Sequence, residues 1–600
     1  MNQSHHVVYI AEDNGRIYVG SSHNPALDAV YFTRQGIPFL WCISQPLPAY
    51  LAEWVKEETA LFLKKGGERP SSAKFFRALL RSFGQHPQVA AALVPPRLVS
   101  ADAFYRVPCN LGVPPVLEGR LLRYGEVLGW KERTGGFAPL AFRDHLHLLA
   151  LAGKILMFPA ITAGPEGWRC HRCGNKTAID LIPCERCQGV CPACADCRSL
   201  GLLRGCEWLY AFPSLHRLIP RSGPLLQLSY ELSPPQQAAA EQVLKLVNDP
   251  SQSCCLVWAV CGAGKTEVVY PAMEAVLMRG GRVLFAVPRR DVVVELRERI
   301  AKAFPQVPVV GLYGGTPERY GKGSVTVATT HQVLRFYRAF DLVILDELDA
   351  FPFRGSPMLK MALERARKPE GKLVYMSATP TEELIRRGQR GEVHLAFISA
   401  RHHGFPVPEP KIVLRRWCHW GESRRQREAL IRALDQEILR TFRWRRLLLF
   451  VPYVAMAQPL MELLKTRGWP VDYCYAADPL RQEKIRRFRE ADPMILVATS
   501  LLERGVTIPQ VDVVILFAHE ARIYDASTLI QMSGRVGRTA QWPTGRCLMV
   551  AKEKTPAMVR ALGIIRQFND QAQKQRYLSP EGEKYLVQMR KGKGDNYSSL

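Results

Sequence analysis

Residues 254–266 of the 600-residue chain read CCLVWAVCGAGKT, an apolar run that passes directly into a glycine-rich turn. Such an apolar run is typical of a strand buried on both faces of a parallel sheet. Small residues at 261–264 let backbone N–H groups approach phosphate oxygens, and the N-terminus of a following helix favours anions. The stretch therefore predicts an α/β fold with a nucleotide at the end of this strand.

Two residues at the end of this turn have side chains suited to binding a nucleoside triphosphate and its metal ion. Lys265 would reach the β- and γ-phosphates of a nucleoside triphosphate, and the Thr266 hydroxyl would ligate Mg²⁺. The first position of the motif is Ala259, where Gly is usual, and Ala is tolerable before the tight turn. The predicted nucleotide-binding residues are Ala259, Val260, Cys261, Gly262, Ala263, Gly264, Lys265 and Thr266.

Acidic residues end another apolar run at residues 341–349, DLVILDELD. Asp346 would hold the Mg²⁺ shell, and Glu347 would orient and polarise the attacking water. Upstream, the amide of Gln236 offers a donor and an acceptor to the edge of adenine. Ser233 and the two prolines before Gln236 also fit a helix N-terminus, and both roles can hold at once.

Two arginines complete the predicted catalytic set. Arg535 and Arg538 stand in QMSGRVGR at residues 531–538, one helical turn apart, so both can face one cleft. Guanidinium groups stabilise charge on a transferring γ-phosphoryl group. If they come from an opposite lobe, the site is complete only when the lobes close. The plainer alternative is a solvated helix face.

Apolar runs alternate with helical segments over residues 232–575, which predicts two consecutive α/β lobes with parallel sheets. The predicted strands are 254–259, 283–287, 324–328, 342–345, 373–376, 447–451, 471–475, 494–498 and 513–517. The proline-containing stretch 402–410 is the expected linker. The expected domains are an N-terminal mixed accessory domain at 1–165, a cysteine module at 166–215, lobe 1 at 216–402, lobe 2 at 403–580 and a basic tail at 581–600.

The accessory domain shows no catalytic motif. We expect it to open with a hairpin around Asn14-Gly15 and to contain a helix at residues 50–65. A structural or binding module is the default interpretation.

Eight cysteines with repeated Cys-x₂-Cys spacing predict structural zinc. They are Cys170, Cys173, Cys184, Cys187, Cys191, Cys194, Cys197 and Cys206. One or two ions fit, and the pairing is open: the first pair can join either the second or the third. Basic residues among them suggest DNA contact: Arg172, Lys176, Arg186 and Arg198.

The charge balance favours a polyanionic partner. The chain has 81 Lys+Arg against 55 Asp+Glu, a net charge of +26, which indicates nucleic acid first and an anionic membrane surface second. A hydrophobic fraction of 47% rules out wholesale disorder. We expect no secretory leader and no membrane span, and hence a reducing cytoplasm in which clustered thiols bind metal.

Residues 411–446 interleave arginines with Trp417, Trp420 and Trp444. Charge with aromatic faces suits single strands, but a solvated charged face with core tryptophans is the commoner arrangement.

Several segments resemble superfamily-2 helicases and translocases. Residues 377–380, SATP, look like the motif that couples hydrolysis to movement, and residues 288–290 and 329–332 sit where such motors contact the nucleic-acid backbone. Residues 498–506 resemble motif V, and residues 531–538 resemble motif VI with its arginine finger.

A narrower resemblance is to the ComFA family of late-competence DNA-uptake ATPases of Gram-positive bacteria. It rests on the order of cysteine cluster, phosphate loop and DELDAFP at residues 346–352, and covers residues 165–575. It implies an ATPase stimulated by single-stranded DNA that brings transforming DNA across the cytoplasmic membrane. It also implies a phosphoribosyltransferase-like partner and a DNA channel, with the protein at most peripheral on the membrane; a homo-oligomer stays open.

Two alternatives remain. A primosomal replication-restart helicase shares similar motifs, but carries its cysteines within the second lobe, whereas here they precede Lys265. A non-enzymatic zinc scaffold with a vestigial nucleotide fold is the alternative of another class. The complete set of candidate catalytic residues favours the motor.

Overall fold

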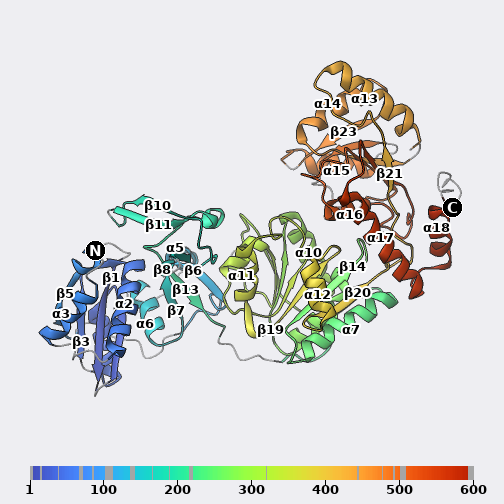
Figure 1. Ribbon diagram of the computed structural model, residues 1–600. Coiled ribbons are helices and arrows are strands. Elements are labelled where there is room, and N and C mark those ends of the chain that lie inside the picture. The colour runs from blue at the N-terminus through green and yellow to red at the C-terminus, as the bar shows by residue number, and fades with distance from the viewer. Residues whose placement is uncertain are drawn as a thin grey trace.

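The computed structural model describes residues 5–13, 16–37, 39–65, 72–83, 87–101, 112–134, 142–164, 167–187, 189–214, 220–318, 320–441, 445–475, 477–490, 494–499 and 508–591. Figure 1 shows an elongated arrangement in which the N-terminal region, a cysteine-bearing unit and two α/β lobes follow one another. The predicted α/β class with two parallel-sheet lobes and an N-terminal cysteine module is confirmed.

Lobe 1 is built on a parallel sheet of order β16-β17-β15-β18-β19-β14-β20. Its strands are β14 (Cys254–Ala259), β15 (Val283–Val287), β16 (Val309–Leu312), β17 (Val325–Thr329), β18 (Phe340–Leu345), β19 (Arg367–Ser377) and β20 (His394–Ile398). Its helices are α7 (Pro234–Asn248), α8 (Lys265–Val268), α9 (Tyr270–Met278), α10 (Arg290–Ala303), η2 (Thr330–Arg335), α11 (Pro357–Ala366) and α12 (Glu382–Gln389). Apolar residues cover both faces of the sheet, as expected for a parallel sheet.

Lobe 2 carries a second parallel sheet, of order β21-β26-β25-β22-β24-β23. Its strands are β21 (Lys411–Leu414), β22 (Arg446–Phe450), β23 (Val471–Cys474), β24 (Ile495–Ala498), β25 (Val511–Leu516) and β26 (Cys547–Ala551). Its helices are α13 (Arg424–Glu437), η3 (Leu439–Thr441), α14 (Val454–Lys465), α15 (Arg481–Glu490) and α16 (Ala526–Ser533). All nine predicted strands are present within a few residues, whereas β16, β20, β21 and β26 were not predicted.

The N-terminal unit is a sheet of order β2-β1-β3-β5 with helices packed on it. Its elements are β1 (His5–Asp13), β2 (Arg16–Ser22), α1 (Pro25–Arg34), β3 (Phe39–Ser44), β4 (Leu47–Pro48), α2 (Ala49–Lys64), α3 (Ala73–Ser82), α4 (Pro87–Ala90) and β5 (Leu93–Leu98). The predicted helix at 50–65 is therefore α2. β1 and β2 pair antiparallel as the hairpin requires, although the Asn14-Gly15 turn lies outside the described residues.

A second unit carries the cysteines. It contains β6 (Arg120–Arg123), α5 (Tyr124–Thr134), α6 (Phe142–Leu151), β7 (Leu156–Pro159), β8 (Ile161–Gly164), β9 (Gly167–Cys170), β10 (Ile179–Cys184), β11 (Gly189–Cys194), η1 (Asp196–Leu200), β12 (Leu203–Arg204) and β13 (Trp208–Phe212). β13 pairs with both β6 and β7, so strands before and after the cysteines form one sheet. The predicted boundary at residue 165 runs through this unit, and the domain limits stay a prediction.

Buried polar groups join the N-terminal unit to this second unit. His147 of α6 lies 2.8 Å from the carboxylate of Asp28 in α1, and His23 lies 2.7 Å from Asp144 of α6. Burial lowers the pKa of His23 to about 4, although its hydrogen bond to Asp144 acts in the opposite direction. His23 is therefore neutral near pH 7, and the junction is held by hydrogen bonds rather than by that charge.

Two C-terminal helices return to the linker between the lobes. They are α17 (Pro556–Lys574) and α18 (Pro580–Arg590). The ring of Phe568 in α17 stacks on Phe397 of lobe 1, with centroids 5.2 Å apart, and the side chain of Asn569 bonds both the N–H and the carbonyl of Val407. Residues 581–591, expected in a basic tail, are instead part of α18 or follow it directly, because buried Tyr585 bonds Gly545. Residues 592–600 lie outside the described part.

Candidate functional site

The glycine-rich turn after β14 forms one wall of a cavity of about 840 Å³ between the lobes. Residues 261–266 line this cavity, whereas Ala259 and Val260 are buried behind them. Gly264 is the N-cap of α8 and has φ of 71°, and a Cβ at this position would lie 2.4 Å from the Gln236 amide nitrogen. Glycine is therefore required here both by the left-handed backbone and by close packing.

Gln236 lies under this turn. Its amide nitrogen donates to the carbonyl of Ala263 at 2.9 Å, and its carbonyl oxygen accepts from the backbone N–H and the hydroxyl of Ser233. The capping box with Pro at the start of α7 matches the predicted helix N-terminus. Both ends of the amide are used by the protein itself, and adenine recognition by Gln236 stays a prediction.

The acidic residues of DELD lie at the end of β18, facing Lys265. The Lys265 ammonium is 3.7 Å from a carboxylate oxygen of Asp346. Burial is the largest single influence and lowers the pKa of Lys265, but the negative charges around it, of which Asp346 contributes most, together raise that pKa. Burial raises the pKa of Asp346, with Lys265 partly offsetting this. The pair places a cation and a carboxylate where a phosphate and Mg²⁺ would be held.

Glu347 lines the same cavity and has φ of 55°, in the left-handed region that L residues seldom adopt. Its backbone N–H donates to the Asp346 carboxylate at 2.8 Å. Strained backbone of this kind clusters at functional sites. Here it occurs at Glu347, the predicted water-orienting residue, in the wall of the nucleotide cavity.

The two predicted arginines have different positions. α16 ends at Ser533, so Arg535 and Arg538 lie in the turn after the helix and not on one helical face, as the spacing had suggested. Arg538 lines the nucleotide cavity, and a Cβ added at Gly262 would be 3.8 Å from its Cγ. Arg535 is buried and is not among the residues that line the cavity. The structure thus brings Arg538, but not Arg535, to the phosphate loop.

A residue that the sequence did not single out connects these parts. Arg401, one residue before the predicted linker, donates through Nε to the Cys261 carbonyl at 3.0 Å and through its terminal nitrogens to the carbonyls of Gly534, Val536 and Gly537. Its guanidinium is buried, and burial lowers its pKa to about 10, which leaves it charged near pH 7. Arg401 therefore ties the phosphate loop to the turn that carries Arg535 and Arg538. A lone arginine at the end of a lobe gives no sequence signal.

The lobes touch at the phosphate loop. The Cys261 thiol lies 3.4 Å from the side-chain oxygen of Gln531, and a Cβ added at Gly534 would lie only 2.5 Å from that of Cys261. A larger residue at 534 would separate the lobes here.

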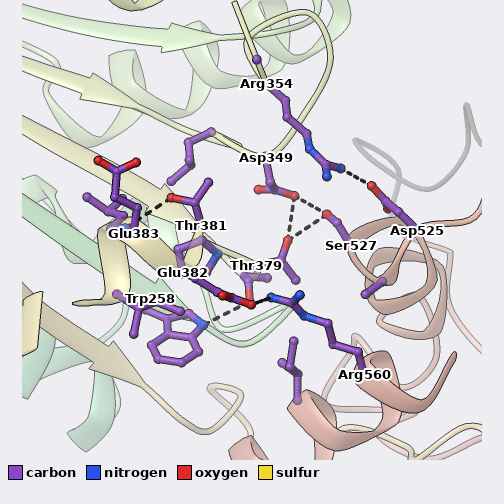
Figure 2. Close-up of a pocket in the computed structure, with 18 of the residues that line it drawn as sticks. Trp258, Asp349, Arg354, Thr379, Thr381, Glu382, Glu383, Asp525, Ser527 and Arg560 are labelled. Atoms are coloured by element: carbon purple, nitrogen blue, oxygen red, sulfur yellow. Dashed lines mark hydrogen bonds and ion pairs between the residues drawn. The ribbon is translucent and has the colours of Figure 1, made fainter. Parts of the chain in front are cut away.

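On its other side, the interlobe cleft contains a second cavity, of about 1160 Å³. Figure 2 shows Asp349, the last acid of DELD, accepting hydrogen bonds from Thr379 of the SATP segment at 3.0 Å and from Ser527 of lobe 2 at 2.6 Å. Two ion pairs also cross the cleft there: Arg354 with Asp525, and Arg560 with Glu382. The acidic motif, SATP and lobe 2 are therefore joined by one hydrogen-bond network.

The eight predicted cysteine ligands form two groups of four thiols. The first is Cys170, Cys173, Cys194 and Cys197; the second is Cys184, Cys187, Cys191 and Cys206; within each, the sulfur atoms lie within 4.8 Å of one another. The sulfur atoms are 3.8 Å apart for Cys170 and Cys197, 3.3 Å for Cys173 and Cys194, and 3.9 Å for Cys184 and Cys206. Tetrahedral zinc with Zn–S of about 2.3 Å requires sulfurs about 3.8 Å apart, so both groups fit such an ion.

The grouping differs from both predicted pairings, because Cys191 and Cys194 separate. They lie on β11, and residues three apart on a strand point to opposite faces. Arg172 also differs from the expectation of DNA contact: it is buried and donates to the Cys197 sulfur at 3.3 Å. Arg186 is exposed but paired with Glu207 at 3.1 Å.

Other predicted contact segments are only partly described. Most of the segment that resembles motif V, residues 500–506, lies outside the described residues, as does Trp444. Trp417 and Trp420 pack against the core of lobe 2, which favours the core interpretation over a stacking platform. No described helix combines the length and apolar character needed to span a membrane.

Comparison with known families agrees with this layout. Residues 137–211 match a model of the competence protein ComFA N-terminal domain, residues 233–386 match a DEAD/DEAH box helicase model, and residues 429–540 match a helicase conserved C-terminal domain model.

Two relatives match over most of their length. The chain is 34% identical over 426 residues to competence protein ComFA of Bacillus subtilis (strain 168), covering 70% of this chain and 90% of the relative. It is 34% identical over 382 residues to competence protein ComFA of Streptococcus pneumoniae (strain ATCC BAA-255 / R6), covering 63% and 86%. Replication restart protein PriA of Bacillus subtilis is 25% identical, with coverage of 39% and 31%.

Among solved structures, S. cerevisiae Dbp5 bound to RNA and ADP BeF3 matches with a TM-score of 0.42 at 19% identity, covering 56% of this chain and 91% of that chain. RecG bound to a three-way DNA junction matches with a TM-score of 0.40 at 19% identity, covering 60% and 47%. The family models match the cysteine module and the two helicase lobes in this order, and the 34% identity extends over 90% and 86% of the two ComFA relatives. The chain therefore belongs to the ComFA family of competence proteins, which are ATP-dependent helicase-like enzymes.

Proposed function

We propose that the protein is a motor that hydrolyses ATP when it holds single-stranded DNA and thereby powers import of transforming DNA during competence. The observation that carries this proposal is one interlobe cavity lined by Lys265, Asp346 and Glu347 from lobe 1 and by Arg538 from lobe 2. Lobe 1 supplies the carboxylates and the lysine, and lobe 2 supplies the guanidinium. These are the groups that enzymes use to catalyse phosphoryl transfer.

In this proposal Lys265 and the turn hold the phosphates, and Thr266 and Asp346 hold Mg²⁺, which would neutralise phosphate charge. Glu347 orients the attacking water, and Arg538 stabilises charge that develops on the γ-phosphoryl group. Since these groups come from two lobes, closure and hydrolysis are linked, and a strand lying across both lobes is gripped differently in each state.

We assign structural zinc to both thiol groups. Four buried or half-buried thiols per group leave no position for a reacting water, so the role is in folding rather than in catalysis. We further propose that the protein is cytoplasmic and meets the membrane only through partners, such as a phosphoribosyltransferase-like competence protein and the DNA channel.

The direct test is steady-state ATPase activity with single-stranded DNA, duplex DNA and RNA of equal length at one salt concentration, because phosphate-driven binding depends strongly on salt. We expect the greatest stimulation by single-stranded DNA. Glu347→Gln should abolish stimulated hydrolysis while the variant still binds DNA. Glu370→Gln, which removes an exposed carboxylate of β19, is the matched control and should hydrolyse ATP like the parent protein.

Equal turnover of Glu347→Gln and the parent protein would remove Glu347 from its role. Stimulation by fork-shaped duplexes alone would favour the replication-restart alternative, and undetectable hydrolysis with every nucleic acid would favour a scaffold.

A further inference from the structure

Phe351 is the most exposed large apolar side chain among the described residues, with 87% of its surface open to solvent. Exposing a phenylalanine to this extent forgoes its hydrophobic stabilisation. It follows directly on the DELDA segment, in the loop between β18 and α11. An aromatic side chain held out of the core in such a loop is free to contact a ligand.

Phe351 lines a cavity of about 670 Å³ formed jointly by the cysteine module and lobe 1. The module contributes residues 173–177 and Asp196, and lobe 1 contributes His331 together with residues 351–352, 354–359 and 361. His331 belongs to the segment 329–332 that resembles a backbone-contact motif. The cavity therefore adjoins the predicted path of the nucleic acid.

The two walls of this cavity are fixed to each other. Arg365 of α11 donates to the His171 carbonyl at 3.0 Å and to the Leu334 carbonyl at 2.8 Å, so it joins the module to lobe 1. A Cβ at Gly174 would lie 2.3 Å from the Met361 sulfur. The module and lobe 1 therefore pack directly against each other beside the cavity.

The chemistry of the lining suits a single strand. Lys176 supplies positive charge, and Arg354 adds a guanidinium that it shares with Asp525 of lobe 2. The one carboxylate in the lining, Asp196, accepts a hydrogen bond from the Asn175 amide. Cations that follow a phosphate backbone, with an aromatic face on which a base stacks, are the features by which proteins bind single-stranded nucleic acid.

The same short loop reaches the nucleotide cavity. Glu347, four residues before Phe351, lines that cavity, and Asp349 accepts hydrogen bonds from Ser377 at 2.6 Å and from Ser527 of lobe 2. Arg354, three residues after Phe351, pairs with Asp525 of lobe 2. A base stacked on Phe351 would thus restrain a loop that also carries Glu347, the proposed water-orienting residue, and that contacts lobe 2 through Asp349 and Arg354.

We propose that Phe351 is a base-stacking residue for single-stranded DNA in the cavity between the cysteine module and lobe 1, and that this contact is how DNA stimulates hydrolysis. The inference rests on the proposed function, since it requires a motor that binds single-stranded DNA. It adds a specific site in which the protein recognises a DNA base as well as the phosphate backbone. It also gives a reason for the cysteine module to lie against lobe 1.

The test measures affinity by fluorescence anisotropy for labelled oligothymidylate and for an abasic strand of the same length and charge. The parent protein should bind the abasic strand more weakly. Phe351→Ala should bind oligothymidylate roughly tenfold more weakly than the parent, within the range for loss of one stacked base, and should no longer distinguish the two strands. Phe351→Trp should restore both the affinity and the discrimination.

The DNA concentration for half-maximal ATPase stimulation should rise in parallel for Phe351→Ala. Leu181→Ala is the matched control, because Leu181 is 62% exposed on β10 of the module but does not line the cavity. Discrimination by Phe351→Ala equal to that of the parent, or by Phe351→Trp no better than by Phe351→Ala, would overturn the inference and leave the proposed function intact. A parent protein that binds no single-stranded DNA would instead overturn the proposed function.

Discussion

At the scale of single residues, Arg401 is the point where three parts of the chain meet. Its planar guanidinium directs donors along fixed lines, and the carbonyls it reaches belong to the phosphate loop and to the turn after α16. Lysine has one ammonium group and cannot span these acceptors. The residue therefore positions groups on both lobes without lining the nucleotide cavity itself.

Arg401→Ala should lower the free energy of unfolding by about 1–3 kcal/mol, because buried carbonyls lose their donor. Urea denaturation followed by circular dichroism measures this change. Arg390→Ala serves as control, since the Arg390 side chain is 72% exposed, and it should shift stability by less than about 0.5 kcal/mol. An unaltered midpoint for Arg401→Ala would show that these hydrogen bonds do not form in solution.

The positions of Lys265, Asp346 and Glu347 beside one cavity could be predicted from sequence, because short motifs at strand ends fix them locally. The position of Arg401 could not, because its acceptors lie 140 residues before it and more than 130 after it. The spacing of Arg535 and Arg538 was misleading, because α16 ends before both of them.

At the scale of elements, β11 explains the grouping of the cysteines. Its pairing with β10 places Ile182 opposite Cys191 and Ile179 opposite Cys194, so the strand runs between the two thiol groups. Ligand spacing alone suggested that Cys191 and Cys194 act together. The alternation of side chains along a strand would have separated them, but the repeated Cys-x₂-Cys pattern gave no indication that residues 189–194 form a strand.

Cys170→Ser combined with Cys173→Ser should halve the zinc content of the purified protein, from two ions per chain to one, because the second thiol group is independent of these residues. Inductively coupled plasma mass spectrometry gives the zinc-to-protein ratio. Cys42→Ser, outside both groups, should retain both ions. Loss of both ions in the double variant would mean that the groups fold as one unit, and retention of both would exclude the first group as a metal site.

At the scale of the whole molecule, the lobes meet where the phosphate loop approaches α16. The two α/β lobes were predictable, since each strand of a buried parallel sheet is an apolar run. The return of α17 and α18 to the linker was not, because an amphipathic helix does not specify which surface it covers. Here that surface includes Phe397 of lobe 1 and the linker residue Val407.

Gly534→Ala tests the approach of the lobes. Its φ of −66° permits alanine, so the main obstacle is the contact with Cys261, whose Cβ is 2.5 Å from the added Cβ, whereas the Ile530 carbonyl oxygen lies at 3.1 Å. We expect slower ATP hydrolysis and a longer interlobe distance, measured by fluorescence energy transfer between dyes on exposed sites of the two lobes. The double variant Gly534→Ala with Cys261→Gly should recover part of the activity, since it removes both the Cys261 Cβ and the Cys261 sulfur that the added methyl would crowd. Parent-like turnover and distance in Gly534→Ala would show that the lobes do not approach so closely.

The sharing of β11 between two thiol groups also has a consequence for how the chain finds its fold. If β11 slipped by one residue against β10, Cys191 and Cys194 would each be presented to the wrong neighbours, and both groups would be incomplete at once. Binding of metal at either group therefore requires the correct register of β11. Chains with misaligned strands would be expected to bind little metal and to be degraded before any nucleotide is bound.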